Sequence, residues 1–153
     1  MSQASSARAS YRERLWPAPT LFIALLLIIP AVMLAVTPLN ADLALPVALG
    51  LFAIVTGSLL LSAPTISVSG GELTAGSARI PVALLGAVET LGADRLRATI
   101  GPGADARAFL LVRGYIHRGV KLEVVDPEDP APYWVLTSRR PAELAAAIEA
   151  ARG

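Results

Sequence analysis

The 153-residue sequence contains no cysteine, and only 16% of its residues are charged. The lack of cysteine excludes disulfides, thiolate zinc sites, iron–sulfur clusters and cysteine nucleophiles. Soluble domains carry about 25% charged residues, so charge is scarce here. The formal net charge of +1 gives no support for nucleic-acid binding, which requires a clustered basic face. We therefore expect no nucleic-acid partner.

Charge is missing above all from two long stretches in the first half of the chain. Residues 21–36 contain no polar side chain, and residues 43–61 contain no charged one. A bilayer core of about 30 Å needs roughly 20 helical residues, which is close to the length of each stretch. The connection at 37–42 is too short to do more than reverse the chain. The sequence therefore predicts an α-helical transmembrane hairpin.

The predicted organisation has three parts. They are an N-terminal segment at 1–19, a hairpin at 20–62 with spans at 20–37 and 43–62, and a terminal domain at 64–153. Two alternatives are a cleaved signal peptide with its apolar region at 21–29, and a buried helical pair in a soluble protein. The apolar stretch is longer than that of a usual signal peptide and a second stretch follows at once, so the membrane hairpin is favoured.

The charges that flank the hairpin predict its orientation. Arg8, Arg12 and Arg14 precede the first span, whereas the turn contains Asp42 and no basic residue. Basic residues remain on the cytoplasmic side, so the N-terminus is expected there. Two crossings return the chain to the cytoplasm. We expect a cell-membrane (plasma-membrane) protein with two spans and with both termini cytoplasmic.

Small residues in the two spans suggest how the helices pack. They fall on one face of each predicted helix, where they would let the backbones approach closely. Pro30 is expected to kink the first helix because it lacks an amide donor. Neither span contains an ionisable residue, which argues against a transporter. The predicted packing residues are Ala24, Ala31, Ala35, Gly50, Ala53 and Gly57.

From residue 64 onward the pattern becomes that of short strands. Apolar and polar residues alternate at 65–69 and 120–124, with a Gly70-Gly71 turn after the first of these strands. Residues 109–112 form a continuous apolar run, typical of a strand buried on both faces. Residues 141–151 are alanine-rich and predict a helix. About seven strands followed by one helix predict an α+β domain with the element order of a small pleckstrin-homology-like (PH-like) barrel.

Three segments together resemble a known family. They are 11–17 (YRERLWP), 101–110 (GPGADARAFL) and 126–141 (DPEDPAPYWVLTSRRP). Their pattern resembles an actinobacterial membrane-protein family, classed as a domain of unknown function with two N-terminal spans. The resemblance covers nearly the whole chain and implies a membrane location. It implies no catalytic or binding residue.

Arginines are the candidate ligand-binding residues. The glycines at 101 and 103 free the backbone near Arg107, which could pair with a phosphate, although a turn with local Asp105–Arg107 pairing is favoured. Arg139 and Arg140 could contact anionic headgroups or simply lead into the last helix. His117 has no partners at a recognisable spacing and is expected to be solvated. Asp126, Glu128 and Asp129 are interrupted by prolines and favour an exposed turn over a calcium loop.

Three functional hypotheses remain from different classes of protein. The first is a membrane-tethered, noncatalytic module that binds a protein partner or a lipid headgroup. The second is an accessory subunit of a larger membrane complex that uses the small-residue helix faces. The candidate partners are the lipid bilayer and either another membrane protein or further copies of this chain in a homo-oligomer. The third is an enzyme with an unrecognised site. We favour the first, with no catalytic residue, cofactor or metal expected, because no nucleophile or general base stands beside a supporting neighbour.

Overall fold

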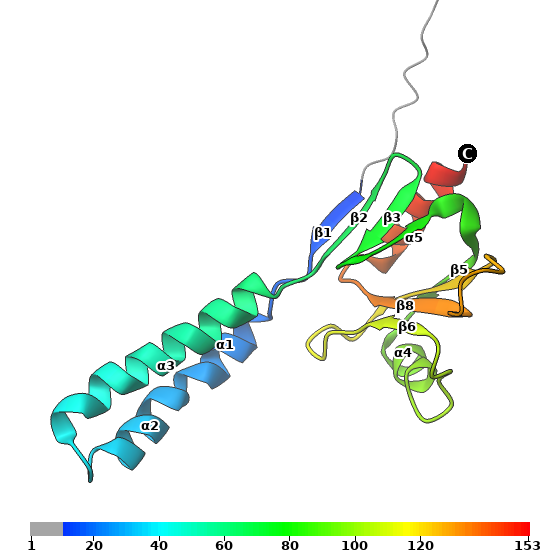
Figure 1. Cartoon of the computed structure of the whole chain (residues 1–153). Coiled ribbons are helices and arrows are strands. Elements are labelled where there is room, and N and C mark those ends of the chain that lie inside the picture. The colour runs from blue at the N-terminus through cyan, green and yellow to red at the C-terminus, as the bar shows by residue number, and fades with distance from the viewer. Residues whose placement is uncertain (1–10) are drawn as a thin grey trace, which may run out of the picture. The chain divides into compact units, whose positions relative to one another are not determined.

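The computed structural model describes residues 11–153, which divide into two compact units. Residues 16–63 form a helical unit. Residues 64–153, together with the described residues 11–15, form a second unit that we call the two-sheet domain (Figure 1). Arg8, which contributed to the predicted orientation, lies outside the described residues.

The helical unit contains the two predicted apolar helices. The first is α1 (Pro19–Leu26) continued by α2 (Ile28–Val36), and the second is α3 (Ala41–Leu61). Both are long and apolar enough to cross a membrane. Asn40 begins α3, because its side-chain oxygen accepts hydrogen bonds from the backbone N–H groups of Asp42 and Leu43 at 3.0 and 3.2 Å.

The irregularity expected at Pro30 is present in the turn that precedes it. Pro30 has no N–H to donate to the carbonyl of Leu26, and its ring crowds the backbone there. The helix is accordingly interrupted at Leu27, between α1 and α2. The N–H of Leu27 bonds to the carbonyl of Ala24 at 3.2 Å, the tighter bonding of a 3₁₀ turn.

The predicted small-residue faces are not the faces that pack this hairpin together. Ala24, Ala31, Ala35, Gly50 and Ala53 are exposed, and Gly57 is half-buried. A Cβ added to either glycine would meet no atom within 4 Å. The buried residues of α3 are instead Ala44 and Ala48, which are 1% and 0% exposed. The two most buried residues of α3 are therefore not among the predicted packing residues.

The first sheet of the two-sheet domain, sheet A, combines one strand that precedes the helical hairpin in the sequence with three strands that follow it. Its order is β1–β2–β3–β4, all antiparallel, and its strands are β1 (Tyr11–Arg14), β2 (Thr65–Ser69), β3 (Glu72–Ala75) and β4 (Ala78–Pro81). Gly70 and Gly71 form the β2–β3 turn with positive φ angles of 60° and 78°, as glycine permits. The domain boundary predicted at residue 64 therefore omits the strand at 11–14.

The second sheet, sheet B, has the order β5–β7–β8–β6. A short 3₁₀ helix, η1 (Val82–Leu84), leads into it, and α4 (Ala93–Thr99) follows its first strand. Its only parallel pairing joins β6 to β8. Its strands are β5 (Leu85–Leu91), β6 (Phe109–Leu111), β7 (Gly119–Val124) and β8 (Tyr133–Thr137).

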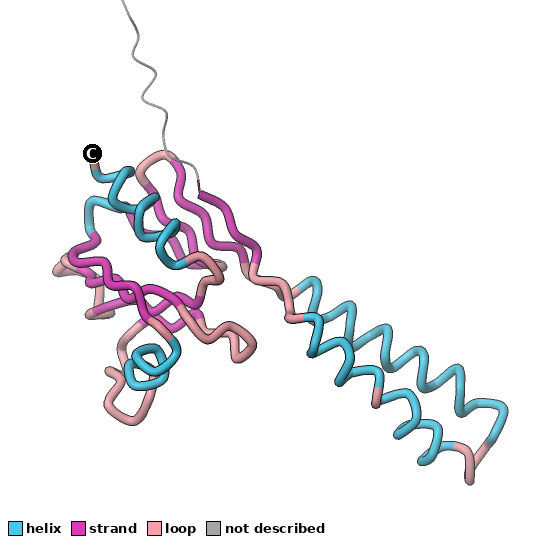
Figure 2. Tube along the Cα trace, turned by 180° about the vertical axis from the view of Figure 1, so that it is seen from behind, coloured by secondary structure: helices cyan, strands magenta, loops and turns pink. Residues whose placement is uncertain are grey.

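Two of the sequence expectations for this region were wrong. The apolar run at 109–112 is an edge strand rather than a strand buried on both faces, since β6 pairs only with β8 and Leu110 is 42% exposed. The strands also do not close into a barrel: they form two separate four-stranded sheets (Figure 2). The coarser prediction of an α+β domain with a C-terminal helix is confirmed.

The main core lies where α5 (Pro141–Arg152) packs against strands of both sheets. This core joins the inner faces of sheet A and sheet B. Burial of each large apolar side chain contributes about 1.5–3 kcal/mol to the stability of the domain. At the edge of this core the rings of Phe109 and Trp134 are in contact, tilted by 44° with their centroids 4.5 Å apart. A second, smaller core lies under α4 on the other face of sheet B. Its buried members are Leu91, Leu96 and Val135.

Candidate functional site

A buried carboxylate joins β1 to the segment that precedes α5. Glu13 is 6% exposed, and its alternation with Arg12 and Arg14 directs it into the domain. Its Oε2 accepts hydrogen bonds from the Tyr11 hydroxyl at 2.6 Å and from Ser138 Oγ at 2.5 Å. Its Oε1 accepts one from the backbone N–H of Arg139 at 2.9 Å. Three donors therefore satisfy a charge that burial would otherwise make costly.

The surroundings of Glu13 raise the pKa of Tyr11 to about 12. Burial is the largest cause, because it disfavours the phenolate. The hydrogen bond to Glu13 acts in the same direction, since it requires the phenol proton. The guanidinium of Arg140 lies 5.4 Å from the centre of the Tyr11 ring, within the range of a cation–π contact.

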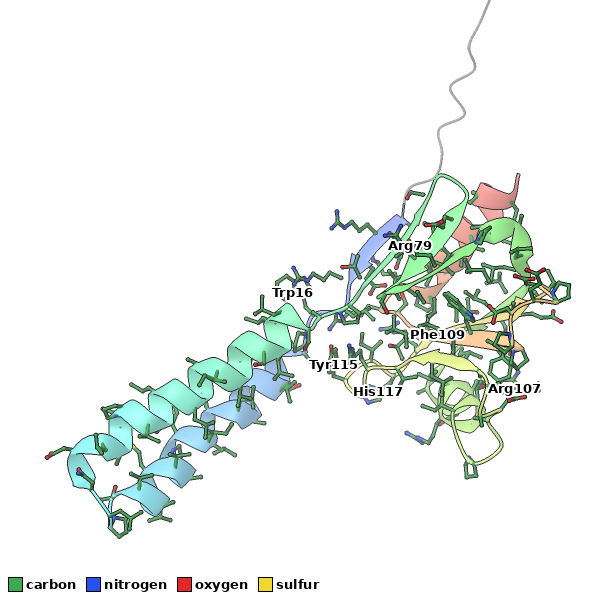
Figure 3. All side chains as sticks on the ribbon, in the orientation of Figure 1. Trp16, Arg79, Arg107, Phe109, Tyr115 and His117 are labelled. Atoms are coloured by element: carbon green, nitrogen blue, oxygen red, sulfur yellow. The ribbon has the colours of Figure 1, made fainter. Side chains whose placement is uncertain are left out.

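The connection between β6 and β7 is held against this same part of the domain. The Tyr115 hydroxyl donates a 2.9 Å hydrogen bond to the carbonyl of Leu15, the last residue before the helical unit. Buried Thr137 fixes the start of the connection, since its Oγ1 accepts from the N–H of Arg113 and donates to the carbonyl of Leu111. Tyr115 and His117 project from this connection (Figure 3). The connection is thus fixed at both of these points.

A hollow of about 510 Å³ lies beside the connection. Arg118 and His117 are exposed along it, and the Arg139 guanidinium lies 6.0 Å from the centre of the Tyr115 ring. Among the described residues that line the hollow, none is acidic. We call it the cationic hollow. Its lining residues are Gly92, Ala93, Tyr115, Ile116, His117, Arg118 and Arg139.

A smaller and mainly apolar hollow of about 120 Å³ adjoins the first one. The two share Ala93, Ile116 and His117 in their linings. Leu96 and Ile100 of the α4 region add apolar surface to the smaller hollow. A ligand with an anionic group and a short apolar part would therefore find both kinds of surface next to each other.

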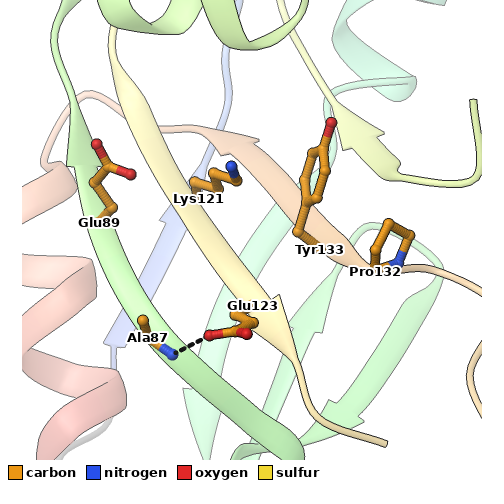
Figure 4. A pocket seen from close by; sticks show the side chains of 6 residues that line it. All are labelled: Ala87, Glu89, Lys121, Glu123, Pro132 and Tyr133. Atoms are coloured by element: carbon orange, nitrogen blue, oxygen red, sulfur yellow. Dashed lines mark hydrogen bonds between the residues drawn. The ribbon is translucent and has the colours of Figure 1, made fainter. Parts of the chain in front are cut away.

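A third hollow, of about 290 Å³, lies on the outer face of sheet B (Figure 4). Its charged groups already have partners. Glu89 pairs with Arg95, Glu123 accepts a 3.4 Å hydrogen bond from the N–H of Ala87, and the Lys121 ammonium lies 4.5 Å from the centre of the Tyr133 ring. Because charges of both signs line this hollow and already have partners, it favours no single class of ligand.

The arginines predicted to contact anions lie in different surroundings. Arg107 pairs with Asp105 through bonds of 3.2 and 3.0 Å, a local arrangement that lowers the pKa of this carboxyl. Arg140 pairs with Glu143 at 3.0 Å. Arg139 alone of the three lines the cationic hollow. The turn that was favoured for Arg107 is therefore confirmed.

The other polar residues singled out in the sequence lie in turns or at the surface. His117 is exposed, as expected, yet it lies in the lining of the cationic hollow. The Asp126 carboxylate accepts the N–H of Glu128 at 2.9 Å. The Asp129 carboxylate accepts a hydrogen bond from the N–H of Ala131 at 2.8 Å. These acids thus shape the β7–β8 turn.

Sequence reasoning did not identify Glu13, Tyr115 or Arg118 as members of one site. Two of the segments that carry the family resemblance, at 11–17 and 126–141, meet at the Glu13 cluster. The presence of both segments in the family pattern was the one sequence signal that could have linked them. It could not show that a carboxylate in one segment accepts hydrogen bonds from the other.

Comparison with known proteins places the chain in a family but gives it no activity. The family model described as "Protein of unknown function (DUF3093)" matches residues 10–148. No curated protein and no solved structure matches the chain. The matched span contains β1, both apolar helices and all the residues that line the cationic hollow.

Proposed function

The chain belongs to this family of proteins of unknown function (DUF3093), and from that premise we propose that it is a noncatalytic, membrane-anchored binding module. The helical hairpin anchors it in the cell membrane with both termini in the cytoplasm. The two-sheet domain stays at the membrane surface and binds the anionic headgroup of a lipid in the cationic hollow. This proposal rests on the two apolar helices and on the charge of that hollow.

The pairing of β1 with β2 supports a helical hairpin whose two helices each cross the membrane once. β1 precedes the helices and β2 follows them, yet the two strands pair. This pairing supports a topology in which the chain enters and leaves the bilayer on the same side. Signal-peptide cleavage after the first helix would also remove Tyr11 and Glu13 from the domain interior. A reporter fused after Gly153 should be active only in the cytoplasm, and activity only outside the cell would contradict this topology.

The described side chains favour binding over catalysis. The buried carboxylate of Glu13 is occupied by three hydrogen-bond donors, so it is not available as a general base. His117 is exposed, and no described hydrogen bond or ion pair links it to a carboxylate that would orient it. In a Ser-His-Asp triad, such a carboxylate orients the histidine. The structural role of Glu13 and the setting of His117 thus suit a module without turnover.

The composition of the cationic hollow is the observation that carries the choice of ligand. Arg118 and Arg139 provide guanidinium groups, which pair well with phosphate oxygens. Tyr115, on the same wall, is hydrogen-bonded to Leu15, which the chain links directly to the helical unit. The chain thus leads from this contact directly into the first apolar helix. An anionic lipid headgroup is the phosphate-bearing ligand that a membrane-anchored domain would meet.

The test uses the full-length protein in phosphatidylcholine nanodiscs. Glycerophosphoglycerol, the soluble headgroup of phosphatidylglycerol, is titrated while the NMR signals of Tyr115 and His117 are followed. We expect saturable shifts and a roughly tenfold loss of affinity in Arg118→Gln, which corresponds to about 1.4 kcal/mol for a charged contact. Arg107→Gln is the matched control, because Arg107 pairs locally with Asp105.

The titration distinguishes headgroup binding in the cationic hollow from its alternatives. No saturable shift, or an equal loss of affinity in Arg107→Gln, would refute binding in the cationic hollow. Tighter binding of inorganic phosphate than of glycerophosphoglycerol would instead assign the hollow to a free phosphate. Turnover of any ligand that disappears in His117→Ala would contradict the noncatalytic assignment.

A further inference from the structure

The outer face of sheet A carries a row of polar side chains that runs across all four strands. The pairing register aligns Arg12 with Ser67, Ser67 with Thr74, and Thr74 with Arg79. Successive strands lie about 4.8 Å apart, so a guanidinium stands at each end of a row with two hydroxyls between. The apolar neighbours of these residues in each strand point to the opposite face, toward the core.

The charge on this face is almost entirely positive. Arg12 and Arg79 are exposed, and within residues 11–153 neither forms an ion pair. Arg14, which opposes Thr65, adds a third guanidinium to the same face. Glu72 is the one acidic residue that the described strands place there, and it lies at the β2–β3 turn. The remainder of the face is mostly hydroxyl-bearing.

The strands that carry this face continue directly into the helices. Only residues 15–18 separate β1 from α1, and residues 62–64 separate α3 from β2. A residue spans at most about 3.6 Å, so each connection reaches less than about 15 Å. A hydrogen bond of 2.9 Å from the N–H of Leu15 to the carbonyl of Pro64 holds the two connections together. Each connection contains a proline, Pro17 or Pro64, which lacks the N–H needed to continue regular backbone hydrogen bonding.

We propose that the outer face of sheet A lies on the anionic surface of the bilayer that holds the hairpin. The guanidinium groups of Arg12, Arg14 and Arg79 pair with lipid phosphates, and the hydroxyls of Ser67 and Thr74 donate to phosphate oxygens between them. Basic residues close to an anionic leaflet are attracted by its negative surface potential. The short connections raise the effective concentration of this face at the membrane, so modest contacts suffice.

This docking surface differs from the cationic hollow, although it rests on the same membrane anchoring. The hollow holds one headgroup between side chains of the 112–118 connection and Arg139. The outer face of sheet A is a strand surface that contacts several lipids at once. Arg12→Gln and Arg79→Gln test the face, whereas Arg118→Gln tests the hollow.

The experiment exploits the absence of native cysteine. A single cysteine replaces Thr74 on the outer face or, as the matched control, Ala146, which is exposed on α5. Each full-length variant carries a fluorophore in nanodiscs that contain phosphatidylglycerol and a lipid with a nitroxide on its headgroup. We expect severalfold stronger quenching at position 74 than at position 146. Arg12→Gln with Arg79→Gln should remove most of the difference.

Two further measurements distinguish docking of sheet A from headgroup binding in the cationic hollow. Quenching at position 74 should fall when phosphatidylcholine replaces phosphatidylglycerol, and it should persist in Arg118→Gln. If headgroup titration of the hollow fails while this quenching persists, only the proposed ligand of the hollow is lost. Equal quenching at positions 74 and 146, indifference to phosphatidylglycerol, or failure of the chain to enter nanodiscs would overturn the docking surface.

Discussion

Ser138 donates a 2.5 Å hydrogen bond to Oε2 of Glu13, although 125 positions separate the two residues in the chain. The Tyr11 hydroxyl donates to the same oxygen at 2.6 Å, so two side chains converge on one buried atom. β1 is therefore attached to the two-sheet domain by its side chains as well as by its pairing with β2.

Glu13→Ala should destabilise the two-sheet domain by about 3 kcal/mol, because it removes the acceptor of three hydrogen bonds, two of them buried. The measurement is denaturant unfolding of the full-length protein, followed by the fluorescence of Trp134 in a Trp16→Phe background. Glu143→Gln is the control. It removes an exposed ion pair with Arg140 and should cost less than about 1 kcal/mol. Equal effects of the two variants would contradict a structural role for Glu13.

The stability of the domain should fall as the pH rises from about 10 to about 12. Burial and the bond to Glu13 raise the pKa of Tyr11 from 10.0 to about 12. The unfolded chain therefore loses this proton first, and over that interval the folded state binds more protons than the unfolded one. The contribution is complete below pH 10 and is lost as the pH passes 12. Unfolding midpoints of the wild type should show this fall more steeply than those of Tyr11→Phe, and parallel curves would refute it.

A fragment that begins at Thr65 should fold poorly, although the sequence pattern alone suggests that the terminal domain is independent. The fragment lacks Tyr11 and Leu15, which are 7% and 0% exposed, and it lacks the carboxylate that Ser138 contacts. Replacing residues 16–63 by a short Gly-Ser loop should restore folding, since Leu15 and Pro64 are hydrogen-bonded neighbours. Dispersed amide spectra for the looped form but not for the fragment are expected. A well-dispersed spectrum of the fragment would show that β1 is dispensable.

Ala48→Leu should separate the two apolar helices more than Gly57→Leu does. Ala48 is 0% exposed, so a larger side chain must push the helices apart, whereas a Cβ at Gly57 meets nothing within 4 Å. The distance between nitroxides at the exposed positions Leu34 and Leu49 reports the change by pulsed electron paramagnetic resonance in nanodiscs. A larger shift in Gly57→Leu would restore the packing face that the sequence suggested.

Periodic patterns predicted most of the elements because local burial determined them. The alternation in β2, the apolar stripe of α5 and the length of the two apolar stretches each depend on neighbouring residues alone. β1 could not be recognised in this way, since three of its four residues are charged and its partner strand lies beyond the hairpin. α4 also lacks a periodic pattern that could be recognised, because it is short and Leu96 is its only buried residue.

The candidate site was less predictable than the fold. Arg139 was singled out for its charge, and the structure places it in the cationic hollow. Its neighbours there come from the β6–β7 connection, whose path is set by long-range bonds from Tyr115 to Leu15 and from Arg113 to Thr137. Such pairings depend on the assembled sheets. No spacing within the sequence encodes them.

The division of sheet A across the hairpin also imposes an order on biosynthesis. β1 is translated before either apolar helix, but its partner β2 appears only after both have been made. Domains usually fold as units during translation, at about 5–20 residues per second. β1 must therefore remain unpaired until both helices have left the ribosome, and the Glu13 carboxylate waits longer still for Ser138. A chain that stalls before Ser138 lacks two of the three donors to Glu13, so β1 cannot be fully attached to the domain.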